Sequence, residues 1–215
     1  MPQGHLNVAH RPVADVRRGR LIAVEGVDGA GKTTQARTLT RWLNREGFRA
    51  VYTCEPTQGP VGRLVRKHLS GRLKLSEETV ALLFAADRLE HLRTFVKPYL
   101  KRGFTIVSDR YLHSSIAYQT ALTGRPDWVE QINGLAPEPD LSILLDVPVG
   151  MAIERLRLRR SERYERMRFL RRVRRNYLRL VRSGRMVLVD GRGGRGDVAH
   201  MIAEKVRRHL IGFGR

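Results

Sequence analysis

The amino-acid sequence predicts an α/β protein built on a doubly wound parallel sheet of five strands. Five short apolar runs rich in β-branched residues recur along the chain, helical segments lie between them, and no linker or repeat divides them. Runs this short and this continuously apolar are expected of strands that are buried on both faces. The ligand of such a sheet is expected beyond the carboxyl ends of its strands. The runs are Leu21–Val24, Ala50–Tyr52, Phe104–Val107, Leu141–Leu145 and Met186–Val189.

The intervening helices have recognisable ends. A helix is predicted over Thr33–Glu46 because Gly47 follows it, the residue type that commonly ends helices. Ser76 predicts the N-cap of another helix, with acidic residues in its first turn, that runs to about Lys97 and ends before Pro98. Two further helices are predicted, one with Pro148 in its first turn and one over Asp197–Leu210.

Length and composition favour one compact domain. The chain has 215 residues and a single cysteine, Cys54, so no internal disulfide can form. No apolar run approaches the roughly 20 residues that a membrane span needs. Residues 1–19 are interpreted as a basic extension because they lack the apolar core of a secretory signal. Residues 20–215 are predicted to form the domain, and the cytoplasm is the expected compartment.

The formal net charge of +20 is concentrated in one segment. Between Met151 and Arg182 lie 13 arginines and three glutamates, so the segment contributes +10. Such a surface attracts polyanions, either nucleic acid or nucleoside polyphosphates. It is equally explained as a solvated helix face, and the charge alone identifies no partner.

A glycine-rich motif follows the first predicted strand. The sequence from Gly26 to Thr33 matches G-x-x-x-x-G-K-[ST], and it lies between a strand and a helix, which is the context that this motif requires. Its backbone N–H groups converge on phosphate oxygens, Lys32 is expected to reach the β- and γ-phosphates, and the Thr33 hydroxyl is expected to hold Mg²⁺. The motif predicts ATP or GTP binding. The residues assigned to the donor are Gly26, Val27, Asp28, Gly29, Ala30, Gly31, Lys32, Thr33 and Thr34.

Three polar clusters are candidates for the acceptor site. Glu55-Pro56 follows the second strand, and Asp109-Arg110-Tyr111 closes the third. Phe84 and Arg88 are four residues apart and share one helix face, where a ring and a guanidinium could hold a base. A carboxylate at a strand end can hold hydrated Mg²⁺, and an adjacent arginine can clamp a phosphate. Two alternatives remain open: Phe84 as a core aromatic, and Asp109 as a helix cap paired with Arg110.

Together these motifs resemble the thymidylate kinase family over almost the whole chain, from Arg20 to Leu210. The P-loop is shared by many kinases, whereas Phe-Ala-Ala-Asp-Arg followed by Asp-Arg-Tyr is far more specific. The resemblance implies a fold of the P-loop NTPase, nucleoside monophosphate kinase type. The matching segments are Glu25–Gln35, Glu55-Pro56, Leu82–Arg88, Ser108–Tyr111, Ala117–Gln119, Leu145–Pro148 and Arg163–Glu165.

The resemblance also implies roles for individual residues at the base and sugar of the acceptor. Phe84 would stack on thymine, Arg88 would donate to the O4 carbonyl, and Ser115 would face the pyrimidine edge. Tyr118 would pack against the deoxyribose, where a 2′-hydroxyl would be crowded. Glu55 is assigned to the same acceptor site.

At the phosphates, the resemblance implies a second group of residues. Arg110 would hold the 5′-phosphate of the acceptor, and Asp28 would lie near that phosphate or the 3′-hydroxyl. Asp109 would help to position Mg²⁺ together with Thr33. Catalysis would fall to Lys32, Asp109 and Arg163, and the metal ligands would be Thr33 and Asp109.

Three positions depart from the family pattern. Cys54 and Thr57 stand where many members have arginine and glycine beside the Glu-Pro pair, which puts one contact to the acceptor phosphate in doubt. Gly29 stands where some members carry a P-loop arginine. The missing charge is expected to come from a lid at about residues 155–168. Arg155, Arg159 and Arg163 would form one stripe there if a helix continued that far.

The prediction is therefore an enzyme that uses ATP and Mg²⁺ to phosphorylate dTMP to dTDP, for dTTP supply. The resemblance implies a homodimer, and neither a membrane nor a specific nucleic-acid partner is expected. One alternative is a kinase of another nucleoside monophosphate or of a deoxynucleoside. A less favoured alternative is a P-loop ATPase that binds nucleic acid, and the last is a binding protein without turnover.

Overall fold

The computed structural model describes residues 18–156 and 160–211, with side chains placed for residues 18–156 and 165–209. The extension predicted at residues 1–19 thus lies almost wholly outside the described residues, as does the centre of the predicted lid.

A five-stranded parallel sheet forms the centre of the molecule, in the order β2-β3-β1-β4-β5. All five predicted runs became strands, so the predicted fold class is confirmed. The strands are β1 (Arg20–Glu25), β2 (Ala50–Cys54), β3 (Thr105–Asp109), β4 (Leu141–Asp146) and β5 (Val187–Asp190). Because β1 lies between β3 and β4, the loop after β1 emerges beside Asp109 at the carboxyl edge of the sheet.

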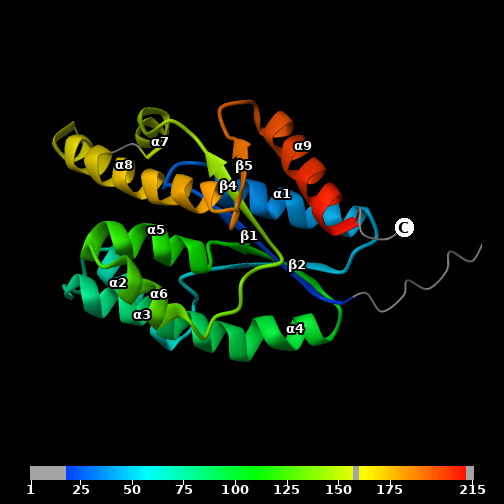
Figure 1. Cartoon of the computed structure of the whole chain (residues 1–215), viewed down its shortest axis with the longest axis horizontal. Helices are drawn as coiled ribbons and strands as arrows, with labels where there is room; N and C mark the ends of the chain where they lie inside the picture. Colours follow the sequence, from blue (N-terminus) through cyan, green and yellow to red (C-terminus); the bar gives the residue numbers. More distant parts are fainter. Residues whose placement is uncertain (1–17, 157–159, 212–215) are drawn as a thin grey trace, which may run out of the picture.

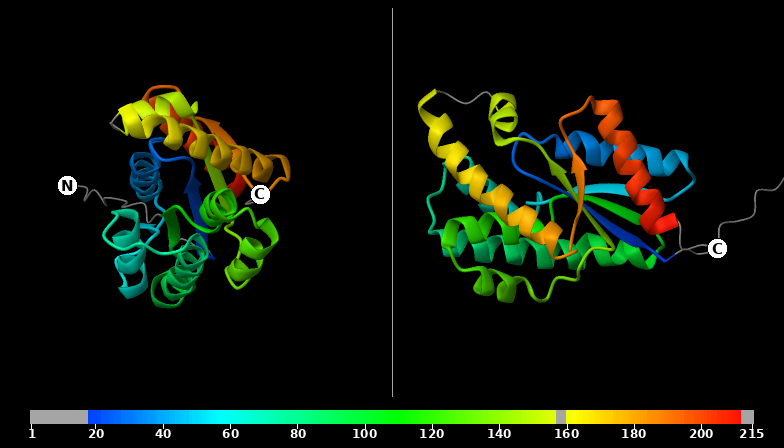
Figure 2. Two further views of the ribbon diagram at one scale, coloured as in Figure 1. Left: turned by 90° about the vertical axis from the view of Figure 1, so that its left-hand side faces the viewer. Right: turned by 45° about the horizontal axis from the view of Figure 1, so that its top comes forward.

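Helices cover both faces of this sheet. In Figure 1, α1 and α9 lie above it, α3, α4 and α5 lie below it, and α8 runs diagonally across the top of α5. Figure 2 shows the same layers from two further directions. The helices are α1 (Lys32–Arg45), α2 (Pro60–Leu69), α3 (Glu77–His91), α4 (Lys97–Lys101), α5 (Leu112–Thr123), α6 (Pro126–Asn133), α7 (Val149–Arg155), α8 (Arg160–Arg182) and α9 (Arg195–Val206), with π-helical turns at Leu92–Val96 and Arg207–Ile211.

The core lies on both sides of β1, β3 and β4. Ile22, Val24, Ile106 and Ile143 are completely buried, as the continuous apolar runs require. Burial of one such side chain stabilises the fold by roughly 1.5–3 kcal/mol. The core therefore fixes the sheet edge from which the site loops emerge.

Helix ends agree with the prediction in two places and differ in a third. Ser76 caps α3, because its Oγ accepts a hydrogen bond from the Thr79 N–H at 3.2 Å. Gly47 follows α1 with a φ of 84°. The prediction that the helix ends before Pro98 is wrong, since it continues to Lys101. The π-helical turn before Pro98 interrupts the regular bonding ladder, so the missing N–H of proline costs less there.

Candidate functional site

The glycine motif forms a tight loop between β1 and α1. Gly26, Gly29 and Gly31 have φ values of 147°, 83° and 97°, which are strained for other residue types. Lys32 is 6% exposed, and its Nζ donates to the carbonyl of Val27 at 2.8 Å. Burial, helped by the nearby Arg110, lowers the pKa of Lys32 to about 8. The loop therefore holds a buried cation against backbone that can bind phosphate.

Position 29 has no room for a side chain. A Cβ at Gly29 would lie 2.2 Å from the carbonyl oxygen of Ala152 on α7, which packs directly on the loop. Arg155, at the end of α7, reaches the same loop, and its Nη1 donates to the Gly29 carbonyl at 3.3 Å. An arginine at position 29 is thus excluded by packing, and positive charge beyond that of Lys32 must come from other segments.

Thr33 and Asp109 meet at the carboxyl edge of the sheet. The Thr33 hydroxyl donates to Asp109 Oδ2, and the Tyr52 hydroxyl lies 3.5 Å from the same oxygen. Burial, together with the carboxylate of Asp109, raises the pKa of Tyr52 to about 12. The alternative interpretation of Asp109 as a helix cap is wrong, because Tyr111 occupies the N-cap of α5 and the Ser114 N–H of the first turn donates to Glu25 Oε1 at 3.2 Å. A hydroxyl and a carboxylate are oxygen ligands of the kind that Mg²⁺ prefers.

Asp28 joins the loop to two arginines. Arg110, from the end of β3, donates to its Oδ1, and Arg166, from α8, donates to its Oδ2. Burial opposes ionisation of Asp28, but Arg110, Lys32 and Arg166 outweigh it and lower the pKa of this carboxyl. The Asp28 N–H donates to the Tyr118 hydroxyl at 2.9 Å. One carboxylate thus holds two cations at the mouth of the site.

Arg110 has an unusual backbone conformation. Its φ is 72°, in the left-handed region, which costs a residue other than glycine roughly 1–3 kcal/mol. Its guanidinium lies over the ring of Tyr118 at 4.9 Å, and Nη1 donates to Ser114 Oγ at 3.2 Å. Such strain persists where the surroundings over-determine it, commonly at functional sites.

Arg88 is at the centre of a buried network. It is 1% exposed, and its Nε and Nη2 donate to Glu55 Oε2 at 3.0 and 2.8 Å. It also donates to the side chains of Asn133 and Ser115 and, at 3.0 Å, to the carbonyl of Tyr111. Each Nη atom of a guanidinium carries two hydrogens, and Nη1 has a single acceptor, Asn133, in the described chain, so one Nη1 hydrogen is left over. The network fixes the orientation of that group.

The other oxygen of Glu55 is held by a histidine. His91 Nδ1 lies 3.0 Å from Glu55 Oε1, and His91 Nε2 lies 2.7 Å from Thr53 Oγ1. All of these groups except Thr53 are buried. The chain Thr53–His91–Glu55–Arg88 therefore connects β2 to α3 without an unpaired charge, as buried ions require.

Phe84 lies one turn before Arg88 and is half buried. Its side chain does not pack against the hydrophobic core formed by the described residues. The core-aromatic alternative is therefore not supported. Gln119, one turn after Ser115 on α5, is 3% exposed, and its Oε1 has no partner in the described chain. Buried polar atoms are normally paired, so this oxygen is available to a ligand or to water.

The sequence departures beside Glu55 have structural counterparts. Arg66 on α2 brings its guanidinium to within 4.0 Å of Cys54 Sγ, and its Nε donates to the Thr57 carbonyl at 3.2 Å. Thr57 donates to Asp87 from its N–H at 2.7 Å and from its hydroxyl at 2.6 Å. A cation from another helix thus stands beside the cysteine. Sequence reasoning missed Arg66 because α2 was not predicted, although Gly59-Pro60 is a possible helix start.

A cavity of about 1040 Å³ brings the donor and acceptor residues together. Arg66, Cys54, Arg166 and Phe169 also line it. The predicted residues along its wall are Asp28, Gly29, Lys32, Thr33, Glu55, Asp109 and Arg110. The predicted base and sugar residues Phe84, Arg88, Ser115 and Tyr118 do not line it, although Arg88 contacts Glu55 and Tyr118 contacts Asp28.

The predicted lid stripe is not a single helix. Helix α7 ends at Arg155, where the Leu156 N–H bonds to the Ile153 carbonyl in a tightened last turn, and α8 begins at Arg160. Arg159 and the side chain of Arg163 lie outside the described residues. Of the described lid arginines, Arg166 reaches Asp28 and Arg155 reaches the loop.

The parallel sheet, the phosphate-binding loop and the charged cavity define a P-loop phosphotransferase of the nucleoside monophosphate kinase class. The family model described as thymidylate kinase matches residues 24–202. The chain belongs to the thymidylate kinase family.

Several similar curated proteins are named probable thymidylate kinase. A "probable thymidylate kinase" of Pyrococcus abyssi is 40% identical over 204 residues, covering 91% of this chain and 100% of its own. The one from Staphylothermus marinus is 42% identical over 196 residues, covering 90% of this chain and 97% of its own. The one from Thermococcus kodakarensis is 43% identical over 170 residues, covering 74% of this chain and 83% of its own. No described helix is long and apolar enough to cross a membrane.

Proposed function

We propose that this chain transfers the γ-phosphoryl group of ATP to the 5′-phosphate of dTMP, in the 1040 Å³ cavity. The observation that carries the proposal is the gathering of cations in one cavity, which Lys32 of the glycine loop, Arg110 and Arg66 all line. Two anions that repel each other need several cations beside them, and this cavity supplies them. Transfer between phosphates depends mainly on such positioning and charge stabilisation.

The acceptor phosphate would displace the carboxylate of Asp28 from Arg110. In the structure, Arg110 and Arg166 share this carboxylate, so both guanidiniums are already held at the mouth of the cavity. A phosphate offers more charge and more acceptor oxygens, and a guanidinium can bind it in bidentate geometry. Arg66 would take the place of the arginine that Cys54 replaces.

The base would lie between Phe84 and the network around Arg88. The remaining Nη1 hydrogen of Arg88 could be donated to the O4 carbonyl of thymine. The Oε1 of Gln119, which has no partner in the described chain, could accept a hydrogen bond from the N3–H group of thymine. Ser115 holds Arg88 in place, and Tyr118 would contact the deoxyribose. Phe84 and Arg88 do not line the described cavity, so the proposal requires the base to extend from its edge.

Mg²⁺ would be held by Thr33 and Asp109, together with phosphate oxygens and water. The oxygen donor set fits the ion, and Mg²⁺ commonly takes only one or two protein ligands in kinases. When bound, the ion would neutralise charge that develops on the transferred group. Thr33 and Asp109 orient each other through their own hydrogen bond.

The lid charge would come from α8. Arg163 is the family-like choice, and Arg166 is supported by its contact with Asp28 at the cavity. We infer that residues 155–168 close over the phosphates and exclude water. Exclusion of water would limit hydrolysis of ATP without an acceptor.

We further infer a cytoplasmic homodimer. Leu64 on α2 and Leu82 on the neighbouring α3 are 40% and 49% exposed. Exposed leucines on adjoining helices would be covered in a dimer. Light scattering on purified protein tests this directly, and a monomeric mass at working concentration would reject it.

The deciding experiment is ADP release from ATP and Mg²⁺ across a panel of acceptors. dTMP should give the highest kcat/KM, ahead of dUMP, dCMP, dAMP and dGMP and of the deoxynucleosides. Preference for another acceptor would support a different kinase of this fold. ATP binding without turnover on any nucleoside monophosphate would reject the proposal.

A further inference from the structure

Helix α8 carries an unusual density of arginines. Between Glu165 and Arg182 it has eight arginines and a single carboxylate, Glu165. Two of the arginines, Arg166 and Arg174, are bound by Asp28 and Asp146. The other six are exposed and form what we call the α8 arginine face: Arg168, Arg171, Arg172, Arg175, Arg179 and Arg182.

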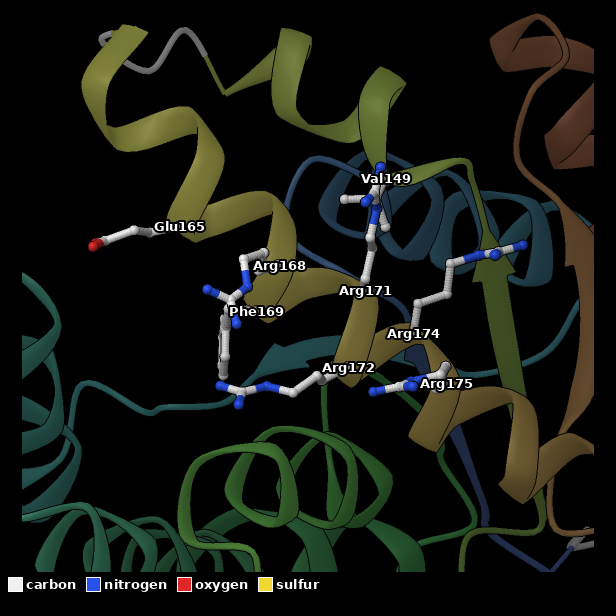
Figure 3. Close-up of a pocket in the computed structure, with 8 residues that line it drawn as sticks. All are labelled: Val149, Glu165, Arg168, Phe169, Arg171, Arg172, Arg174 and Arg175. Atoms are coloured by element: carbon white, nitrogen blue, oxygen red, sulfur yellow. The ribbon is translucent and has the colours of Figure 1, made fainter.

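These six residues lie along one side of the helix. Their spacing of three, one, three, four and three residues places them on a single stripe, opposite the buried Leu170, Val173, Tyr177 and Leu180. Fourteen residues of helix separate the first from the last, a distance of about 21 Å. Figure 3 shows four of them, Arg168, Arg171, Arg172 and Arg175, projecting from α8. They border a hollow of about 810 Å³ between α8 and Val149.

The charges of this face are not neutralised within the described chain. None of the six forms an ion pair there, and Arg172 only lies over the ring of Phe169, at 6.0 Å. Elsewhere on the surface, exposed arginines such as Arg93 and Arg192 are paired with a neighbouring carboxylate. Like charges along 21 Å of helix repel one another, and an extended anion would remove that repulsion.

The residue types favour phosphates as that anion. The segment 165–182 has no lysine, and guanidinium groups bind phosphate in bidentate geometry. The apolar side chains of α8 between residues 167 and 181 are buried or packed against the core, so the stripe offers no exposed apolar row for insertion into a bilayer. A line of charges suits a polymer better than a single nucleotide. A duplex carries one phosphate per about 1.7 Å, so about 12 phosphates lie along the length of this face.

We propose that the α8 arginine face binds the phosphate backbone of double-stranded nucleic acid without sequence preference. The surface adjoins the nucleotide cavity, which shares Glu165 and Phe169 with the hollow beside α8 but is lined by none of the six arginines. The proposal does not depend on which acceptor the enzyme phosphorylates. Such binding would hold a kinase of DNA precursors close to a nucleic-acid surface.

The test measures fluorescence anisotropy of a labelled duplex of about 20 base pairs, from about 50 to about 200 mM salt. The test variant is R171Q/R175Q/R179Q/R182Q, because these four side chains have no hydrogen bond or ion pair in the described chain and none lines the nucleotide cavity. Affinity should fall about tenfold or more, and the slope of log K against log salt should become shallower by about 3 to 4. Kinase turnover should be retained.

The matched control removes the same charge elsewhere. The control residues are exposed and far along the chain from α8: Arg41 and Arg45 on α1, Lys67 on α2 and Arg72 just after α2. All four become Gln. This control should change duplex affinity less than about threefold. Saturating ATP and dTMP should leave duplex binding intact.

Three results would overturn the proposal. The first is absence of duplex binding at about 50 mM salt. The second is an equal loss in both quadruple variants, which would show a general effect of net charge. The third is binding that requires the α8 face but occurs only with polyglutamate or anionic vesicles, which would assign a different partner.

Discussion

The walls proposed for the donor phosphates and for the acceptor base are built differently. The donor wall is one continuous stretch of chain, in which backbone conformation and a single lysine would bind the phosphates. The acceptor wall combines side chains from β2, α3, α5 and α6 in a buried network around Arg88. The comparison indicates that donor residues can be lost without unfolding the protein, whereas the acceptor network also supports the fold.

The largest expected effect is on the donor wall. Lys32→Ala removes the buried cation beside the phosphates, and kcat should fall about 10³-fold, in the range for loss of a strong charge-stabilising group. The melting temperature should stay near that of the parent protein, since among the described residues the ammonium of Lys32 donates only to a carbonyl of its own loop. A large drop in melting temperature would show that the donor wall is also structural.

The lid is expected to contribute next. Arg166→Ala should lower kcat about 10²-fold with a smaller change in KM, because the guanidinium would act on charge that develops during transfer. Arg163→Ala is measured beside it in the same assay. If the Arg166 variant kept normal turnover and the Arg163 variant lost most of it, Arg163 alone would be the lid arginine that stabilises the transferred group.

The acceptor wall should respond in stability as well as activity. Glu55→Gln leaves Arg88 buried with a weaker partner, and breaking a buried ion pair costs about 3 kcal/mol or more. Urea unfolding measures this change. The control is Glu90→Gln, which breaks the exposed ion pair between Glu90 at the end of α3 and Arg93. It should leave the free energy of unfolding almost unchanged. Equal effects in both variants would contradict the structural role of the network.

The Phe84→Ala substitution tests whether the base pocket can be weakened without affecting the donor wall. Loss of stacking should weaken dTMP binding by about 1–3 kcal/mol and leave ATP affinity nearly unchanged. Titration calorimetry with each nucleotide gives both values. An equal loss for the two ligands would remove Phe84 from the base pocket.

The smallest effect is expected in the pH profile. Since the pKa of Lys32 in the free protein is lowered to about 8, the ammonium is charged below this pH and neutral above it. The kcat/KM for ATP should therefore fall as pH rises through about 8. Bound phosphates should keep Lys32 charged to higher pH, so the fall in kcat should occur at higher pH than the fall in kcat/KM. Lys32→Arg keeps its charge, so any residual activity should lack this limb. A flat wild-type profile from pH 7 to about 9.5 would contradict the assignment.

Local patterns along the chain were sufficient for the sheet and the donor wall. Continuous apolar runs predicted all five strands. A strand buried on both faces must be apolar at nearly every position, which holds for β1, β3 and β4, whereas the edge strands β2 and β5 are only partly buried. The glycine motif predicted the loop, because its positive φ angles require glycine. Ser76 and Gly47 predicted helix ends for similar local reasons.

The acceptor wall and the lid depended on contacts that no local pattern encodes. Arg88 is joined to Glu55 and Asn133 across 33 and 45 residues of chain, and Arg166 to Asp28 across 138. The sequence pattern places Phe84 and Arg88 on one helix face, but whether a base can reach them depends on how α3 packs on α5. The missed Arg66 illustrates the same limit, since its relation to Cys54 depends on the position of α2.

The sequence by itself determined which segments are strands, where the phosphate loop lies, and that the chain resembles the thymidylate kinase family. These properties follow from interactions between near neighbours and from burial, which act wherever the segment is placed. Only the tertiary structure decided that Gly29 excludes an arginine, that Asp28 holds two cations together and that six arginines of α8 face outward. Those facts depend on the packing of distant elements, which fixes distances that sequence spacing does not contain.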